Sequence, residues 1–165
     1  MNFCSHCGAG LTHKIPVGDD RRRSGTLSCE MVHYENPKIV VGCIPIWQDQ
    51  VLLCRRAIEP RYGKWTLPAG YLEKGETVEE GARRETFEEA SAKVENITPY
   101  ALYNLPFVSQ IYLMFRSNLI ERKFKPGHES LEVNLFSEGT IPWEQMAFSV
   151  IAVTLKQYFR DRPSG

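Results

Sequence analysis

The pattern of hydrophobic and polar residues predicts strands through most of the chain. Residues 38–47 (KIVVGCIPIW) and 50–56 (QVLLCRR) are mainly apolar and rich in β-branched side chains, with a short polar turn between them. Such runs are typical of neighbouring strands. Pro45 indicates an edge strand or a bulge, because proline cannot donate to a strand ladder. Further apolar segments predict strands at residues 65–67, 97–105, 108–119 and 130–136.

Two segments have the pattern of helices. Residues 148–160 carry apolar side chains at helical spacing, which predicts a final amphipathic helix packed on the core. The second half of residues 69–92 (AGYLEKGETVEEGARRETFEEASA) favours a helix that follows a turn-rich loop. A short helix is expected to begin near residue 141. Helices interspersed with strands place the chain in the α/β or α+β class.

Composition and charge exclude several classes of protein. The 165 residues include 42% hydrophobic side chains, which suits one compact domain with a small appendage. Twenty basic and twenty acidic residues cancel, so no global field attracts nucleic acid or a membrane. We expect neither a secretory signal nor a membrane span. Five cysteines, an odd number, indicate reduced thiols and a cytoplasmic location.

The first 34 residues predict a small appendage that is similar to a zinc ribbon. Cys4 and Cys7 form a C-x2-C pair followed by glycine, in which two thiolates from one tight turn face the same metal. A second pair is expected about 15–20 residues later, and only its second thiol, Cys29, is present. The fourth ligand remains open between His33, His6, His13 and water. The alternative is a ribbon that has lost its metal.

The charge of this appendage argues against a nucleic-acid partner. Residues 21–23 are three consecutive arginines, but residues 1–34 as a whole carry four basic and three acidic side chains, a net charge of +1. A net charge of +1 is too small to favour binding to a phosphate backbone, so residues 21–23 are interpreted as part of a solvated loop. Pro37 stiffens the connection to a second domain, which we assign to residues 35–165.

Three glutamates in the predicted helix indicate a metal site. Glu85, Glu88 and Glu89 lie at positions i, i+3 and i+4 and therefore share one helix face. Three carboxylates this close repel one another unless a cation lies between them. Mg²⁺ and Mn²⁺ are the natural candidates, because both bind carboxylate oxygens and keep several waters. The alternative is a solvated acidic face, where most runs of charge are found.

The spacing of these residues resembles the Nudix box, G-x5-E-x7-R-E-U-x-E-E-x-G-U, in which U is a bulky aliphatic residue. The fixed positions that match in register are Gly70, Glu76, Arg84, Glu85, Glu88 and Glu89. Three positions depart from the box, namely Thr86 and Ala92 at the U positions and Ser91 at the last glycine. The W-x-L-P-x-G sequence at residues 65–70 extends the resemblance, which covers residues 37–160.

This resemblance implies a Nudix α/β/α sandwich with a mixed sheet, preceded by the ribbon-like segment. It implies metal-dependent hydrolysis of a nucleoside diphosphate linked to another group, X. The implied metal ligands are Glu85, Glu88, Glu89 and the backbone carbonyl of Ala69. Glu76 and Arg84 would orient them, since the planar guanidinium positions carboxylates well. The resemblance also implies a homodimer.

The general base is expected outside the box. In several members of the family it is a glutamate that follows the sheet, and here Glu129 lies in a loop and Glu132 in a predicted strand. We prefer either glutamate over His128, because a carboxylate near Mg²⁺ serves both as ligand and as base. The candidate contacts to the diphosphate are Arg55, Arg56 and Gly70. Exposed charges with no role in catalysis are the alternative.

Substrate choice depends on sequence outside the box. NADH pyrophosphatases of the family combine a zinc ribbon with an S-Q-P-W-P-F-P-x-S array, whereas this chain has FVSQIYL at residues 107–113. The H-Y-x-N-P-K and P-W-x-x-x-A-F sequences make it more similar to the FAD/ADP-ribose pyrophosphatase-like group. We therefore expect FAD or ADP-ribose to yield AMP and a second monophosphate, with Tyr103, Phe107 and Tyr112 as candidates for stacking on adenine. The alternatives are NADH and a non-catalytic nucleotide sensor.

Overall fold

The computed structural model describes residues 1–162 of the chain. They form two compact units, Met1–Asn36 and a larger unit that begins at Pro37. No helix within residues 1–162 combines the length and apolar character needed to cross a membrane.

The first unit is a three-stranded antiparallel sheet preceded by a tight turn. Strands β1 (Thr12–Lys14), β2 (Arg23–Gly25) and β3 (Val32–His33) lie side by side in chain order. In the turn, the Gly8 N–H donates to the Cys4 carbonyl oxygen. Among the described residues of this unit, Cys4 is the one buried hydrophobic side chain. Little apolar packing therefore stabilises this sheet.

The larger unit is built on a seven-stranded mixed sheet. Five strands follow the order β10-β5-β4-β9-β8, with β6 beside β5 and β7 beside β4. Strands β4 and β9 run parallel, and the other pairs are antiparallel. The strands are β4 (Lys38–Trp47), β5 (Gln50–Arg56), β6 (Trp65–Thr66), β7 (Ala69–Tyr71), β8 (Val94–Leu105), β9 (Gln110–Leu119) and β10 (Ser130–Phe136).

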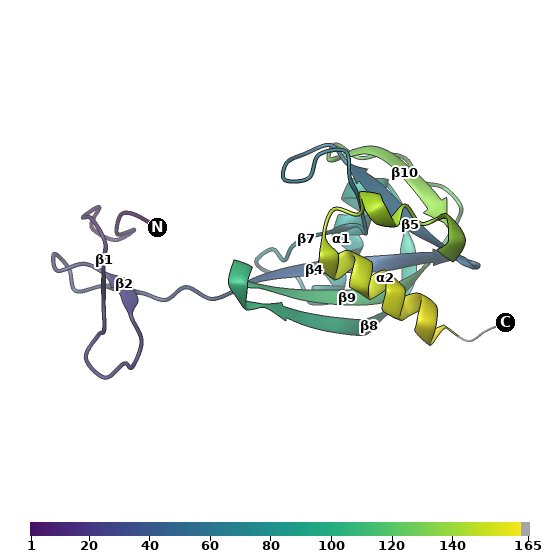
Figure 1. Ribbon diagram of the computed structural model, residues 1–165. Helices are drawn as coiled ribbons and strands as arrows, with labels where there is room; N and C mark the ends of the chain where they lie inside the picture. The colour runs from purple at the N-terminus through teal and green to yellow at the C-terminus, as the bar shows by residue number, and fades with distance from the viewer. Residues whose placement is uncertain (163–165) are drawn as a thin grey trace. The chain divides into compact units, whose positions relative to one another are not determined.

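One long helix covers each face of this sheet, which confirms the α/β/α sandwich (Figure 1). Helix α1 (Val78–Ala90) belongs to a core cluster with Val41 and Leu52, whereas α2 (Ser149–Asp161) belongs to one with Val40. Both faces of β4 and β5 are therefore buried, which explains their long apolar runs. Short 3₁₀ helices are η1 (Pro106–Val108), η2 (Glu138–Thr140) and η3 (Trp143–Gln145).

Pro45 does not mark an edge or a bulge, so that expectation was wrong. It lies in β4, an inner strand, and is in register with Ser117 of β9. On its other side, β4 pairs with β7 at residues 40–42 and with β5 at residues 46–47. Cys43, two residues before Pro45, directs its N–H to that other side. By strand alternation the missing N–H of Pro45 faces the gap between the two pairings.

Candidate active site

The helix that carries the glutamates starts at a capping box. Thr77 Oγ1 accepts a hydrogen bond from the Glu80 N–H, and the Glu80 carboxylate accepts one from the Thr77 N–H. The two bonds satisfy N–H groups that the first turn of a helix leaves free. They define where α1 begins, and with it the direction in which the later glutamates point.

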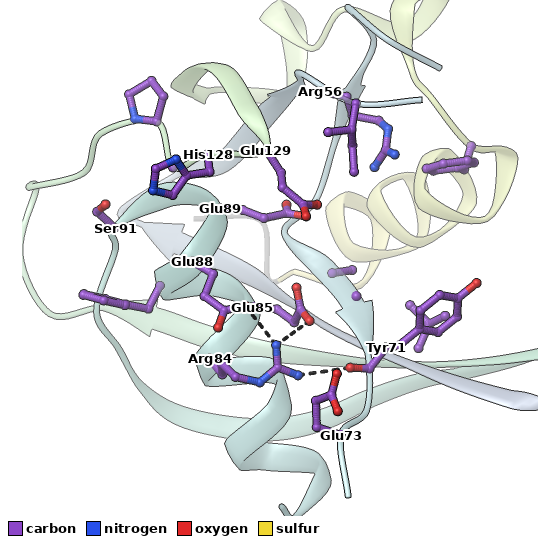
Figure 2. A pocket seen from close by; sticks show the side chains of 18 of the residues that line it. Arg56, Tyr71, Glu73, Arg84, Glu85, Glu88, Glu89, Ser91, His128 and Glu129 are labelled. Carbon is purple, nitrogen blue, oxygen red and sulfur yellow. Dashed lines mark hydrogen bonds and ion pairs between the residues drawn. The ribbon is translucent and has the colours of Figure 1, made fainter. Parts of the chain in front are cut away.

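A cavity of about 1180 Å³ lies against α1 in the larger unit. Figure 2 shows Glu85, Glu88 and Glu89 on one side of α1, with Glu129 and Arg56 approaching from other segments. The predicted metal-binding, catalytic and diphosphate-binding residues that line this cavity are Arg56, Ala69, Gly70, Arg84, Glu85, Glu88, Glu89 and Glu129. These side chains come from α1, β5, β7 and the loop before β10, so the fold brings distant parts of the chain to one place.

Arg84 connects the carboxylates at the edge of the cavity. Its guanidinium binds Glu76 through two nitrogens, at 2.8 and 3.0 Å. It also contacts Glu85 at 2.6 Å and Glu88 at 3.0 Å, and donates to the Tyr71 carbonyl oxygen at 3.0 Å. These bonds to Arg84 lower the pKa of Glu76 to about 2. Arg84 is therefore placed to orient the acidic side chains.

Glu89 is the most deeply buried carboxylate of the site. Only 6% of the residue is exposed, and burial, followed by the charge of Glu85, raises the pKa of Glu89 to about 8. Burial also raises the pKa of Glu85. Among the described residues, no group donates a hydrogen bond to Glu89 Oε2. A buried carboxylate oxygen without a donor is costly, and a cation beside it would remove that cost.

The donors at this end of the cavity fit a hard divalent cation. Glu85, Glu88 and Glu89 would hold it, and the backbone of Ala69 lines the same cavity. A bound Mg²⁺ or Mn²⁺ would neutralise diphosphate oxygens and make a water more acidic. Gly70 leaves room for the Glu85 carboxyl group, because a Cβ at position 70 would overlap that carboxyl group.

The two candidate bases occupy different environments. Glu129 lines the cavity, and its charge contributes to the raised pKa values of Glu85 and Glu89. Glu132 lies in β10 and pairs with Arg55 at 3.6 Å, while Arg55 also donates to the Gly63 carbonyl oxygen. Within residues 1–162, the lining of the cavity includes neither Glu132 nor Arg55. The fold therefore separates Glu129 from Glu132.

Backbone hydrogen bonds attach the loop that carries Glu129 to the end of α1. The N–H of Lys125 donates to the Ala90 carbonyl oxygen at 2.8 Å, and that of Gly127 to the Glu89 carbonyl oxygen at 3.0 Å. At Gly127 the approach is so close that a Cβ would overlap the Glu88 carbonyl group. The position of Glu129 is thus coupled to the backbone of α1.

The other end of the cavity is mainly aromatic and apolar. Of the three aromatic side chains proposed for stacking, Tyr112 lines the cavity, and Tyr103 and Phe107 are not among its described lining residues. Arg56 lies against this end, with its guanidinium carbon 5.2 Å from the centre of the Phe148 ring. Lining residues that the sequence did not single out include Val40, Ile58, Tyr71 and Gln110, whereas Phe148 belongs to the P-W-x-x-x-A-F sequence. They lie on separate elements, so no spacing along the chain connects them.

The three departures from the box have local explanations. Thr86 is fully buried, and its hydroxyl donates to the Ala82 carbonyl oxygen one turn earlier. Ser91 ends α1 with a φ of +49°, the left-handed conformation for which glycine is preferred. Ala92 is 1% exposed and packs in the core beneath α1. At both U positions of the box, a small buried side chain, Thr86 or Ala92, therefore takes the place of a bulky aliphatic one.

The first unit holds a separate cluster of thiols. Ligand atoms of Cys4, Cys7 and Cys29 all lie within 4.8 Å of one another. His33 Nε2 lies 3.3 Å from Cys4 Sγ. This contact with His33 is the main reason why the pKa of the Cys4 thiol is lowered to about 6. Cysteine thiolates at such distances are suited to structural zinc.

Comparisons with known proteins place the chain in a family. A model described as the NUDIX domain matches residues 36–152, which is most of the chain. This chain belongs to the NUDIX family. A second model, which represents the zinc ribbon of Nudix proteins and is described as Nudix N-terminal, matches residues 2–35. A crystal structure of a NUDIX hydrolase from Nitrosomonas europaea is 53% identical, with a TM-score of 0.95 over 100% of this chain and 94% of that one.

Curated relatives of this NUDIX chain are longer proteins. The NAD-capped RNA hydrolase NudC of Photobacterium profundum is 31% identical over 84% of this chain and 50% of its own length. The mitochondrial NAD(P)H pyrophosphatase NUDT13 of Homo sapiens is 31% identical over 94% of this chain and 41% of its own length. The chain thus spans about half the length of the curated relatives that it matches.

Proposed function

We propose that the protein is a divalent-cation-dependent pyrophosphohydrolase that cleaves a nucleoside diphosphate linked to X, with FAD or ADP-ribose as substrate. The observation that carries this proposal is the buried Glu89 carboxylate. One of its oxygens has no donor among residues 1–162, and it lies beside Glu85, Glu88 and Glu129 in one cavity. A solvated acidic helix face would have no reason to bury a carboxylate in this way.

The side chains that line the cavity have separate roles in the proposed hydrolysis. Glu129 accepts the proton of the attacking water, and Arg84 keeps Glu85 and Glu88 in position. Arg56 and Lys125 line the same cavity and supply positive charge to the diphosphate. Arg55 and Glu132, which pair with each other, take no part in this scheme.

The size of the cavity supports a substrate with two arms. Its volume of about 1180 Å³ exceeds the usual range of about 300–1000 Å³ for small-molecule sites. A nucleobase would stack at the end that contains Tyr112 and Phe148, and the diphosphate would lie over the carboxylates. FAD and ADP-ribose both have this architecture, with AMP as the common product.

NADH or an NAD-capped RNA is the second candidate substrate. The observation that favours it is the similarity to relatives named NAD-capped RNA hydrolase and NAD(P)H pyrophosphatase, each 31% identical to this chain. These substrates have the same diphosphate and adenosine groups. An RNA substrate would overturn the expectation, based on charge alone, of no nucleic-acid partner.

Product analysis distinguishes these substrates. The full chain is incubated with Mg²⁺ and, separately, FAD, ADP-ribose, NADH, a diadenosine polyphosphate or an NAD-capped RNA, and products are identified by mass spectrometry. Release of AMP and FMN from FAD, or of AMP and ribose 5-phosphate from ADP-ribose, at higher kcat/KM than from NADH supports the first assignment. Faster cleavage of NADH or the capped RNA supports the second. Binding without cleavage of any substrate would support the sensor.

Variants on α1 link the activity to the cavity. Glu88→Gln and Glu89→Gln should abolish Mg²⁺-dependent cleavage while circular dichroism shows an intact fold. Glu79→Gln is the matched control, because Glu79 lies in the exposed first turn of the same helix. Unchanged turnover in both cavity variants contradicts the proposal. The homodimer stays a prediction, to be measured by sedimentation.

A further inference from the structure

The first unit needs a fourth ligand if it holds zinc in a closed tetrahedral site. Structural zinc has four protein ligands in almost all cases, and only three thiols are gathered here. Because Cys4 is the one buried hydrophobic side chain among the described residues 1–36, apolar packing cannot replace the metal. Small domains of this kind obtain their folding energy from the ion.

The place of the missing thiol is visible in the backbone. In the first turn, the His6 N–H points to Cys4 Sγ at 3.4 Å. In the second, the Ser28 N–H points to Thr26 Oγ1 at 3.1 Å. Thr26 is followed by Cys29 after two residues, as Cys4 is followed by Cys7. The buried Thr26 therefore occupies the position of the first thiol of a second pair, with a hydroxyl that ligates zinc poorly.

The distances around Cys4 are those of a zinc site. With Zn–S bonds of about 2.3 Å and Zn–N bonds of about 2.0 Å, tetrahedral geometry separates two sulfurs by about 3.8 Å and a sulfur from a nitrogen by about 3.5 Å. The observed separations are 3.7 Å from Cys4 Sγ to Cys29 Sγ and 3.3 Å from Cys4 Sγ to His33 Nε2. His33 lies on β3, directly across from Ser24 of β2.

We propose that His33 Nε2 takes the place of the missing cysteine and completes a site of three thiolates and one imidazole with Cys4, Cys7 and Cys29. The imidazole already touches Cys4 but lies outside the tight group of three sulfurs. Metal binding therefore requires the partly buried ring to turn toward the other two thiols. Of the other histidines of this unit, His13 contacts Ser24 Oγ through Nδ1, and His6 is exposed.

Metal binding by the full chain tests this assignment without any measurement of activity. Zinc affinity is measured by competition with a chromophoric chelator, and thiolate ligation by the near-ultraviolet charge-transfer band of Co²⁺, which a carboxylate site does not produce. His33→Ala should weaken zinc binding by more than about tenfold, the lower end of the effect of losing even a supporting contact. His6→Ala and His13→Ala are matched controls and should bind zinc as the natural chain does.

A second variant keeps the test valid if His33→Ala does not fold. Thr26→Cys combined with His33→Ala should restore tight binding, with X-ray absorption showing four sulfurs in place of three sulfurs and an imidazole. Unchanged affinity in His33→Ala, loss of binding in a control variant, or a natural chain without imidazole scattering would each overturn the assignment. Failure of hydrolysis by the protein would leave this test unaffected.

Discussion

At the residue scale, the environment of each glutamate decides its role. Glu129 and Glu132 are three positions apart and look equivalent along the chain. In the structure, Glu129 faces the buried carboxylates, while Glu132 is paired with Arg55 outside the cavity. The cause is an irregularity at the start of β10, because a register shift between Ser130 and Glu132 sets Glu132 opposite Arg55 of β5, its ion-pair partner.

Glu129→Gln should therefore lower kcat by about 10²–10⁴-fold, the usual contribution of a general base. Steady-state hydrolysis of the substrate identified by product analysis measures this loss. Glu132→Gln, the matched control, should keep kcat close to that of the natural chain. A larger loss in Glu132→Gln than in Glu129→Gln would show that the base had been assigned to the wrong carboxylate.

Glu76 should make stability depend on pH. Its pKa is about 2 in the folded protein against an ordinary value of 4.5, so folding favours the ionised form. The stabilisation is complete above about pH 4.5 and is lost as the pH falls toward 2. Urea unfolding should show Glu76→Gln less stable than the natural chain at pH 7, with a smaller difference at pH 3. A difference independent of pH would contradict this account.

At the scale of the element, α1 and the loop before β10 act together. Two backbone hydrogen bonds attach this loop to the last turn of α1, and Gly127 is pressed against the Glu88 carbonyl group. Sequence patterns find the helix and the strand separately. They do not show this contact, because it joins main-chain groups that carry no sequence signal.

Gly127→Ala should displace the loop, since the added Cβ would overlap backbone atoms of α1. We expect lower kcat together with a loss of stability of about 1–3 kcal/mol, which is typical of overpacking. Gly139→Ala is the matched control, because open space surrounds the Cβ position there. Hydrolysis and thermal unfolding of both variants measure the effect, and equal behaviour of the two would count against the close contact.

At the scale of the whole molecule, the sequence predicts the fold better than the site. Strands 38–47, 50–56 and 130–136 agree with the structure residue for residue. The first two are apolar runs buried on both faces, and such runs have sharp ends. The strand expected at 97–105 begins earlier, at Val94, and the one expected at 108 begins at Gln110 after the η1 turn. The acidic helix is predicted from local spacing. The grouping of Tyr71 and Tyr112 in the cavity depends on strand register, because both lie opposite Val40.

Removal of zinc should unfold the first unit and leave the larger unit folded. A strong zinc chelator should abolish the protection of amides in residues 1–36 from hydrogen exchange, because so little apolar surface stabilises that unit. Strands β4, β5 and β9 should stay protected, since each is buried in the sheet of the larger unit. Hydrogen exchange followed by mass spectrometry resolves both regions. Simultaneous loss of protection throughout the chain would contradict separate folding.

The attachment of the loop to α1 also bears on how this scaffold tolerates insertions. Residues 125–127 are held by the carbonyl groups of Glu89 and Ala90, whereas residues 121–123 are exposed and follow Ile120, whose N–H donates to the Lys93 carbonyl oxygen. Extra residues between Ile120 and Phe124 could therefore be accommodated without moving the base, while a single insertion after Lys125 would shift Glu129 out of register. Natural variation in loop length, and any library designed to alter substrate range, should be concentrated before that anchor.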